Sequence, residues 1–253
     1  MFRSFVPALF AAALFAATVH AGTVDLTAPG SSANINGADF NRTDTQPTGT
    51  GVIRSFVRLQ AHGNSTLEKG YNTDGRPLLN DENNSPQFTR SLALDSLQAI
   101  DVGGSSFYRF LLDINEPNSK DASTINLLML QIFLGDAPDK LEANPSDLGA
   151  LIYDLDAGGD TTVALKDIDH GSGSGDYFVD IPVELFQGGS WVYLYSSFDT
   201  LNKHGGFEEW AAVTKAGPPP PVIPLPPAVW SGLAMLGVMG GARIVRMAKR
   251  NAA

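Results

Sequence analysis

The clearest candidates for chemistry are two groups of acidic residues, and the first lies in the segment DLDAGGD. It places Asp154, Asp156 and Asp160 in a glycine-containing turn. Carboxylate oxygens are the hard ligands that calcium prefers, so this turn is a candidate calcium site, although it lacks the further ligands and the closing Glu of an EF-hand. The alternative is that these Asp residues only form the turn, by accepting hydrogen bonds from the backbone.

The second group lies in the segment LDINE, which holds Asp113, Asn115 and Glu116. Carboxylate and amide oxygens together again suit calcium. Calcium is therefore the one cofactor that the sequence suggests. If it binds, melting curves recorded with calcium and with a chelator will differ.

Catalytic motifs are absent from the sequence. It contains no G-x-S-x-G elbow, P-loop, G-x-G-x-x-G or H-E-x-x-H segment. Beyond the N-terminal segment the histidines are His62, His170 and His204, and their spacing fits no metal pair. His170 precedes GSGSGD, where Ser172 or Ser174 would be the nucleophile of a hydrolase, but serine beside glycine more often belongs to an exposed loop. We therefore expect a protein that is not an enzyme.

Alternating aromatic residues form the last candidate site. Trp191, Tyr193 and Tyr195 lie on one face of a predicted strand, where they would stack against a sugar or fill the core. Core packing is the more common role, because aromatic residues suit the interior of a sandwich.

These residues lie in or beside short apolar or alternating runs that are separated by Gly, Asn, Asp and Pro, a pattern typical of β-sheet proteins. The segment FYRFLLDI predicts a half-buried strand, and INLLMLQIF, apolar on both faces, a central one. The sequence thus predicts an all-β fold, an antiparallel β-sandwich or jelly roll, over 52–214, after a loose lead-in over 22–51. Strands are predicted at 52–60, 91–97, 107–114, 125–133, 150–155, 161–165, 177–181 and 191–198.

The charge of the chain excludes one class of function. The sequence has 27 acidic and 17 basic residues, and the segment 22–227 has a net charge of −15 because five of the basic residues lie nearer the ends. Such a surface repels phosphate backbones, so we expect no nucleic-acid partner. There is no cysteine, which excludes disulfides, a thiolate nucleophile and the usual structural zinc site.

Residues 1–21 have the features of a secretory signal peptide. Arg3 is followed by an apolar run over 5–19 and by a small-residue site, so we expect cleavage between Ala21 and Gly22. The alternative, a buried N-terminal helix, would need a polar face that this run lacks.

The C-terminal part contains three successive segments. Residues 215–227 form a Pro-rich linker, 228–245 are predicted to form one transmembrane helix, and 246–253 form a basic tail. By the positive-inside rule, the basic residues should keep this end in the cytoplasm. The basic residues at this end are Arg243, Arg246, Lys249 and Arg250.

This tail resembles the sorting signal of PEP-CTERM proteins of Gram-negative bacteria, in its VPLPA variety. The matching motif is Ile223-Pro224-Leu225-Pro226-Pro227, followed by the hydrophobic segment and the basic cluster. A literal Pro-Glu-Pro is absent, and Pro227 stands where alanine is usual. The resemblance implies recognition by an exosortase in the inner membrane, removal of the helix and delivery to the cell surface or extracellular matrix. Hydropathy and charge also leave open a plain C-terminal membrane anchor.

Four segments of the domain are similar to segments of one group of PEP-CTERM surface proteins. They are EKGYNTDGRP, FLLDINE, GSGSGD and GFEEWA. This likeness implies a shared architecture, for which no catalytic activity has been demonstrated. We therefore expect an exported, non-enzymatic surface or matrix protein, structural or adhesive, whose partners are an exosortase, the inner membrane and exopolysaccharide.

Three other functions remain open. A calcium-assisted carbohydrate-binding module would be retained on exopolysaccharide and lose this retention when Trp191 or the Asp154 group is altered. A membrane-anchored periplasmic protein would keep its C-terminal helix. A hydrolase would show a deep pocket with converging His and carboxylate groups.

Overall fold

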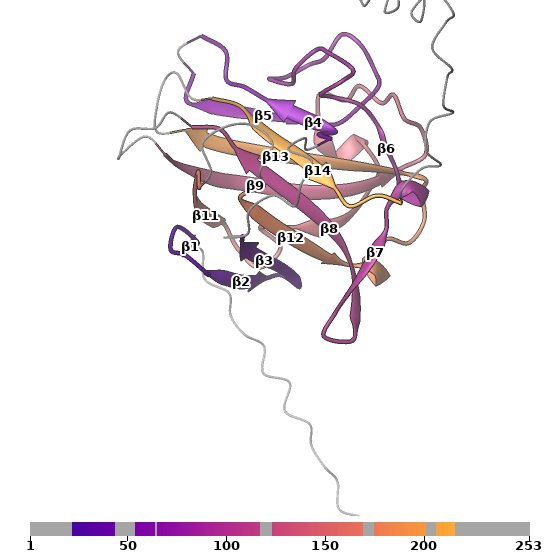
Figure 1. Cartoon of the computed structure of the whole chain (residues 1–253). Coiled ribbons are helices and arrows are strands. Elements are labelled where there is room, and N and C mark those ends of the chain that lie inside the picture. Colours follow the sequence, from indigo (N-terminus) through magenta and orange to yellow (C-terminus); the bar gives the residue numbers. More distant parts are fainter. Residues whose placement is uncertain are drawn as a thin grey trace, which may run out of the picture. The chain divides into compact units, whose positions relative to one another are not determined.

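The described part of the chain forms two β-sheets that pack face to face (Figure 1). The computed structural model describes residues 22–43, 54–63, 65–116, 123–168, 175–200 and 206–215. Within these ranges the three helices are single 3-10 turns, and none is long and apolar enough to span a membrane. The predicted all-β sandwich is thus confirmed, while the predicted helix at 228–245 lies outside the described residues. The 3-10 turns are Leu94–Ser96, Pro145–Asp147 and Val183–Leu185.

Sheet A consists of β1 (Gly22–Asp25), β5 (Leu67–Tyr71), β6 (Leu92–Ala93), β9 (Thr124–Gly135), β10 (Ala150–Asp154), β11 (Thr161–Lys166) and β13 (Trp191–Thr200). Its main path runs in the order β1-β11-β9-β13-β5. Strand β9 is central, as its apolar sequence predicts, because β10 and β11 pair with successive parts of one edge and β13 with the other. All pairs are antiparallel except β1 with β11, which run parallel.

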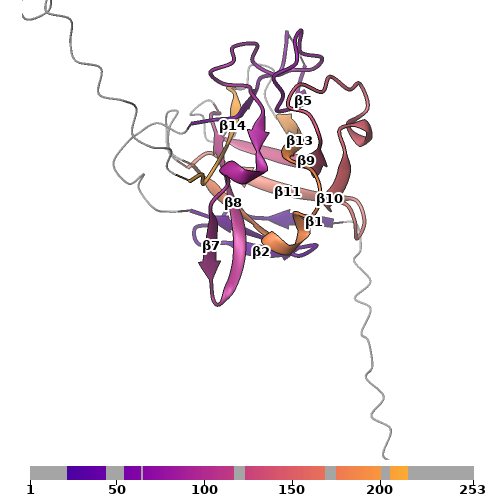
Figure 2. The same cartoon turned by 90° about the vertical axis from the view of Figure 1, so that its right-hand side faces the viewer.

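Sheet B consists of β2 (Ser32–Ile35), β3 (Ala38–Arg42), β4 (Val57–Leu59), β7 (Ala99–Val102), β8 (Ser105–Ile114), β12 (Tyr177–Pro182) and β14 (Glu208–Ala212). Its order is β2-β3-β12-β8-β14-β4, and β7 pairs with the first part of β8. Gly103 and Gly104, both at positive φ, form the two-residue turn between β7 and β8. This hairpin extends below the rest of the sandwich (Figures 1 and 2).

The main core lies between the two sheets. Along β8, Phe110, Leu112 and Ile114 are at most 1% exposed and belong to this core, as the alternation of FYRFLLDI predicts. Trp210 of β14 is fully buried, and its Nε1 donates a hydrogen bond to Ser196 Oγ of β13 over 3.0 Å. This bond satisfies the only polar group of the indole and links the two sheets.

The segment 22–51 was expected to be a loose lead-in, and this expectation is wrong for its described part. Residues 22–43 contain β1, β2 and β3, and β3 pairs with β12 inside sheet B. Each of these strands has five residues or fewer and contributes only one or two apolar side chains, such as Ile35 and Phe40, to the core. Strands this short produce no periodic signal in a sequence rich in Thr, Asn and Gly.

Six of the predicted strands are confirmed. Strands β8 to β13 each match a predicted range to within two residues. The predicted range 52–60 contains only β4 in its described part, and 91–97 contains β6 and a 3-10 turn. Strands β5, β7 and β14 were not predicted.

Candidate functional site

Six carboxylates lie at the end of the sandwich where β8 and β11 finish and β5, β12 and β14 begin. Each is at most 5% exposed. Three contacts join the strand ends here. Glu208 of β14 pairs with Ile114 of β8, and Asp176 N donates to Leu112 O over 2.8 Å. Glu116 N donates to Asp167 Oδ2 over 3.0 Å. We call this group the acidic end; its members are Glu68, Asp113, Glu116, Asp167, Asp176 and Glu208.

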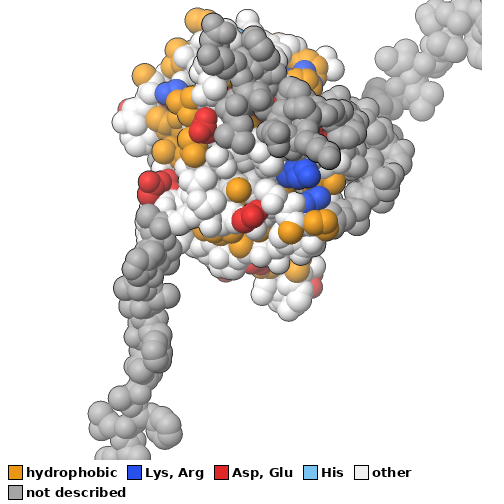
Figure 3. Space-filling model, turned by 90° about the vertical axis from the view of Figure 1, so that its left-hand side faces the viewer, with side chains coloured by type: hydrophobic (Ala, Val, Ile, Leu, Met, Phe, Trp, Pro, Cys, Tyr) orange, Lys and Arg blue, Asp and Glu red, His pale blue; other side chains and the backbone are white. Residues whose placement is uncertain are grey.

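The acidic end lies toward the left in Figure 1, and Figure 3 views the molecule from that side. The acidic and basic side chains visible there are scattered, and neither sign forms one continuous patch. This agrees with the burial of the six carboxylates, which are interior groups and do not form an acidic surface.

Glu208 faces the interior between the sheets. Successive side chains of a strand point to opposite faces, so Glu208 shares a face with Trp210, which reaches across to sheet A. Glu208 has no exposed surface, and neither of its carboxylate oxygens has a hydrogen-bond partner. A buried carboxylate without partners is a rare and costly arrangement in a folded protein.

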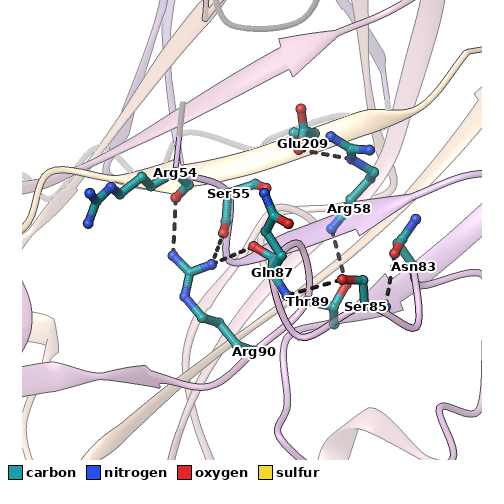
Figure 4. Close-up of polar contacts among 9 residues, drawn as sticks. All are labelled: Arg54, Ser55, Arg58, Asn83, Ser85, Gln87, Thr89, Arg90 and Glu209. Carbon is teal, nitrogen blue, oxygen red and sulfur yellow. Dashed lines mark hydrogen bonds and ion pairs between the residues drawn. The ribbon is translucent and has the colours of Figure 1, made fainter. Parts of the chain in front are cut away.

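Glu209, the next residue, faces the other way, and the charge of its carboxylate is paired with an arginine. Arg58 Nε donates to Glu209 Oε1 over 2.9 Å, and the Arg58 guanidinium lies over the ring of Phe88, 3.5 Å from its centroid, and over that of Phe207, at 4.0 Å. Figure 4 shows Arg58 of β4 pointing toward Glu209 of β14. The two adjacent carboxylates therefore differ in environment while sharing one strand.

The side chains of Thr89 and Arg90 bind backbone atoms around this ion pair. In Figure 4, Arg90 donates to the backbone oxygens of Arg54, Ser55 and Gln87. Arg58 N donates to Thr89 Oγ1 over 3.4 Å. These contacts fasten the edge strand β4 beside β14 and so fix the outward side of the acidic end.

Glu68 enters the acidic end from sheet A. It pairs with Phe198 of β13, a core residue, so its side chain faces the space between the sheets. Its Oε2 accepts a hydrogen bond from Ala61 N over 2.9 Å, whereas Oε1 has no partner. Burial raises the pKa of Glu68 to about 8; the hydrogen bond from Ala61 opposes this shift, and the charges of Glu116 and Asp81 add to it.

Glu116 lies just beyond the end of β8. Both of its carboxylate oxygens are buried and have no hydrogen-bond partner. Burial, with a smaller contribution from the charge of Asp167, raises the pKa of Glu116 to about 7. The charge of Glu116 in turn contributes to the raised pKa of Glu68.

Asp176 has a structural role at this end. Its Oδ2 accepts a hydrogen bond from Ile114 N over 2.7 Å, and its Oδ1 accepts one from Ile168 N over 2.8 Å. Asp176 thereby ties the end of β8 to the chain that follows β11. Burial nevertheless raises the pKa of Asp176 to about 8, against these hydrogen bonds and with the charges of Asp113 and Asp167 adding to the rise.

The acidic end can take up either protons or a cation. Like charges held in a buried site favour protonation or an added positive charge. Within the described ranges, no group of three or more His, Cys, Asp or Glu side chains is arranged to hold a metal ion as it stands.

The structure separates the two predicted acidic groups. Asp113 and Glu116 belong to the acidic end, and Asn115 lies between them with its side-chain nitrogen buried and without a partner. The DLDAGGD segment instead forms the turn between β10 and β11. There Asp156 N donates to Asp154 Oδ1 over 3.0 Å, and Thr161 N donates to Asp156 Oδ1 over 2.8 Å. These contacts support the turn-forming alternative for that segment.

The aromatic residues of β13 lie in two different environments. Tyr193 and Tyr195 are buried on the outer face of sheet A with Tyr71 and Phe133, under the segment 136–149. Tyr193 Oη donates to Ala137 O over 2.5 Å and accepts from Lys140 N over 3.2 Å, which binds this segment to the sheet. The two tyrosines therefore belong to a core, as the more common role predicts.

Trp191 is only half-buried and lines a pocket of about 430 Å³. Tyr108, Asp95 and Lys215 line the same pocket. The pocket contains no histidine, so it does not provide the converging His and carboxylate groups expected of a hydrolase.

The remaining predicted residues fall in two groups. His62 lines a second, polar pocket beside Asp81 and Glu82. The others lie outside the described residues: His170, His204, Ser172, Ser174, Ala21, the motif 223–227 and the four basic residues of the tail.

Sequence reasoning missed Glu68, Asp167, Asp176 and Glu208 as members of one site. A signal existed for three of them. Glu68, Asp176 and Glu208 lie in EKGYNTDGRP, GSGSGD and GFEEWA, and the fourth singled-out segment, FLLDINE, contains Asp113 and Glu116. The fold brings acidic residues of all four segments to the acidic end.

No protein-family model matches the chain, and no curated protein or solved structure matches it.

Proposed function

We propose that the protein is an exported, non-enzymatic component of the cell surface or extracellular matrix, built as a jelly-roll-like sandwich. It is sorted by its C-terminal tail and has a structural or adhesive role in an exopolysaccharide matrix. The observation that carries this proposal is the order of segments in the sequence: an apolar leader, one domain, a Pro-rich motif, an uncharged stretch and a basic end.

The start of the fold supports the predicted leader cleavage. Gly22, the residue that would become the new N-terminus, is the first residue of β1 and pairs with Thr161 of β11. Its nitrogen donates to Asp160 O over 3.1 Å. An N-terminal ammonium keeps this donor, so cleavage before Gly22 leaves the edge of sheet A intact.

The role of the tail is tested by locating the native chain and its variants in the cell. In a Gram-negative host that has an exosortase, we expect the native chain at the surface or in the medium. The double variant Pro224→Ala/Pro226→Ala should stay in the inner membrane as a longer precursor. Pro219→Ala, in the linker but outside the motif, should behave as the native chain does. Equal surface delivery of the double variant would contradict the proposed sorting.

A carbohydrate-binding module is the second candidate function, and the pocket at Trp191 favours it. An indole and a phenol ring beside Asp95 and Lys215 offer a stacking surface and polar contacts for a sugar. If the pocket binds exopolysaccharide, Trp191→Ala will lose retention on it, whereas Tyr193→Phe, which alters only the covered aromatic cluster, will not.

A further inference from the structure

Three carboxylates of the acidic end, Glu68, Glu116 and Glu208, have buried oxygens without a hydrogen-bond partner. Buried charged groups in proteins are normally paired or bound to metal ions. Glu208 has no exposed surface and Glu116 is 5% exposed, yet all four of their carboxylate oxygens lack hydrogen-bond partners. Oε1 of Glu68 is a fifth such oxygen. Either protons or a bound cation would compensate these oxygens, and a single cation would compensate several of them at once.

Two arginines of the neighbouring strands, Arg58 and Arg109, are engaged with other carboxylates. Arg58 is paired with Glu209 over 2.9 Å on the outward side of β14. Arg109 forms a two-pronged pair with Asp180, with both distances 2.7 Å, further along β8 and β12. Both guanidinium groups are therefore engaged away from Glu208.

We propose that the acidic end binds a calcium ion between the two sheets, with Glu116 and Glu208 as ligands and Glu68 beside them. Such an ion would join β5 of sheet A to β8 and β14 of sheet B. It would act as a clamp at this end of the sandwich. The inference stands on these buried oxygens and does not depend on the export proposed above.

The donor set favours calcium over other metals. The acidic end offers oxygen ligands, the chain has no cysteine, and no histidine belongs to the six residues. Calcium accepts 6–8 oxygens in variable geometry and completes its shell with waters and carbonyls, whereas magnesium demands a near-ideal octahedron. Variable geometry matters here because the carboxylates repel one another without an ion and do not form a finished cage.

The first test compares melting of the full-length chain, in mild detergent, with calcium and with EGTA. Calcium sites of extracellular modules have Kd values of about 10⁻⁴–10⁻³ M. At about 10 mM calcium, a site of this strength should raise the Tm by roughly 3–10 °C. Glu208→Gln and Glu116→Gln should reduce this shift to about 1 °C or less.

The adjacent residue provides the matched control. Glu209→Gln changes the same strand and the same type of side chain but removes only the pairing with Arg58. We expect a lower Tm for this variant in EGTA and an unchanged calcium shift. An equal rise in Tm in calcium and in magnesium, or the full rise in Glu208→Gln, would show that the cation only screens charge. Either result would overturn the proposal.

A second measurement does not depend on the stability of a variant. Trp210 lies two residues from Glu208 on the same face, so a terbium ion at the site should show emission sensitised by the indole. Calcium should displace the terbium and abolish this emission, and Glu208→Gln should show little of it. Absence of sensitised emission from the native chain, together with identical melting curves in calcium and EGTA, would also overturn the proposal.

Discussion

Replacing Arg58 by methionine tests how the outward side of the acidic end is held together. The side chain of Arg58 is 17% exposed and that of its partner Glu209 is 3% exposed. The Arg58 guanidinium also covers the rings of Phe88 and Phe207. Removing one member of a buried pair leaves the other charge uncompensated. We therefore expect a loss of about 3 kcal/mol, at the lower end of the usual range because Arg58 retains some contact with water.

This loss corresponds to a decrease in Tm of roughly 6–12 °C for a domain of this size. The assay is thermal unfolding of the full-length chain, followed by circular dichroism. The double variant Arg58→Met/Glu209→Met removes both charges and should recover most of the loss, because apolar groups replace a buried pair at little cost. A single variant within about 2 °C of the native Tm, or a double variant as unstable as the single one, would refute this reasoning.

Three further predictions address other parts of the fold. Trp210→Phe leaves the fully buried Ser196 hydroxyl without its indole partner and should cost about 1–3 kcal/mol from that group alone, measured by urea unfolding. Asp156→Ala removes the acceptor for Thr161 N and should lower the free energy of unfolding by about 1 kcal/mol, without altering the rise in Tm that calcium causes. If this rise were lost, the calcium site would lie in the DLDAGGD segment. The pKa of Glu68 is raised to about 8, so in EGTA the native state keeps a proton that the unfolded state releases near pH 4.5. The free energy of unfolding should therefore fall as the pH rises from about 5 to about 8. A free energy of unfolding that rises over this range would contradict the raised pKa.

The sequence predicts those parts of the fold in which a strand is long enough to repeat its pattern. β8 and β9 were predicted correctly because ten or more residues display alternation or continuous apolarity. β1, β2 and β3 escaped because each has few apolar residues, and β1 and β3 gain stability from pairing with strands far away in the chain. Such pairing depends on the whole sheet, which no local window contains.

The candidate site could be predicted only in part for a related reason. Asp113, Asn115 and Glu116 lie within one short segment, so their proximity is visible in the sequence. Glu68 and Glu208 are 140 positions apart and meet only because β5 and β14 begin at the same end of the two sheets. The sequence also cannot show that Glu208 faces inward and Glu209 outward, since that choice depends on the register of β14.

Mass spectrometry of the two ends of the mature protein tests the proposed export and sorting most directly. The protein should be isolated from the surface or matrix of a Gram-negative host that has an exosortase. We predict that its chain starts at Gly22 and ends at or before Pro227, without the segment 228–253. A mature protein that still begins at Met1 and ends at Ala253 would contradict both cleavages and the function proposed from them.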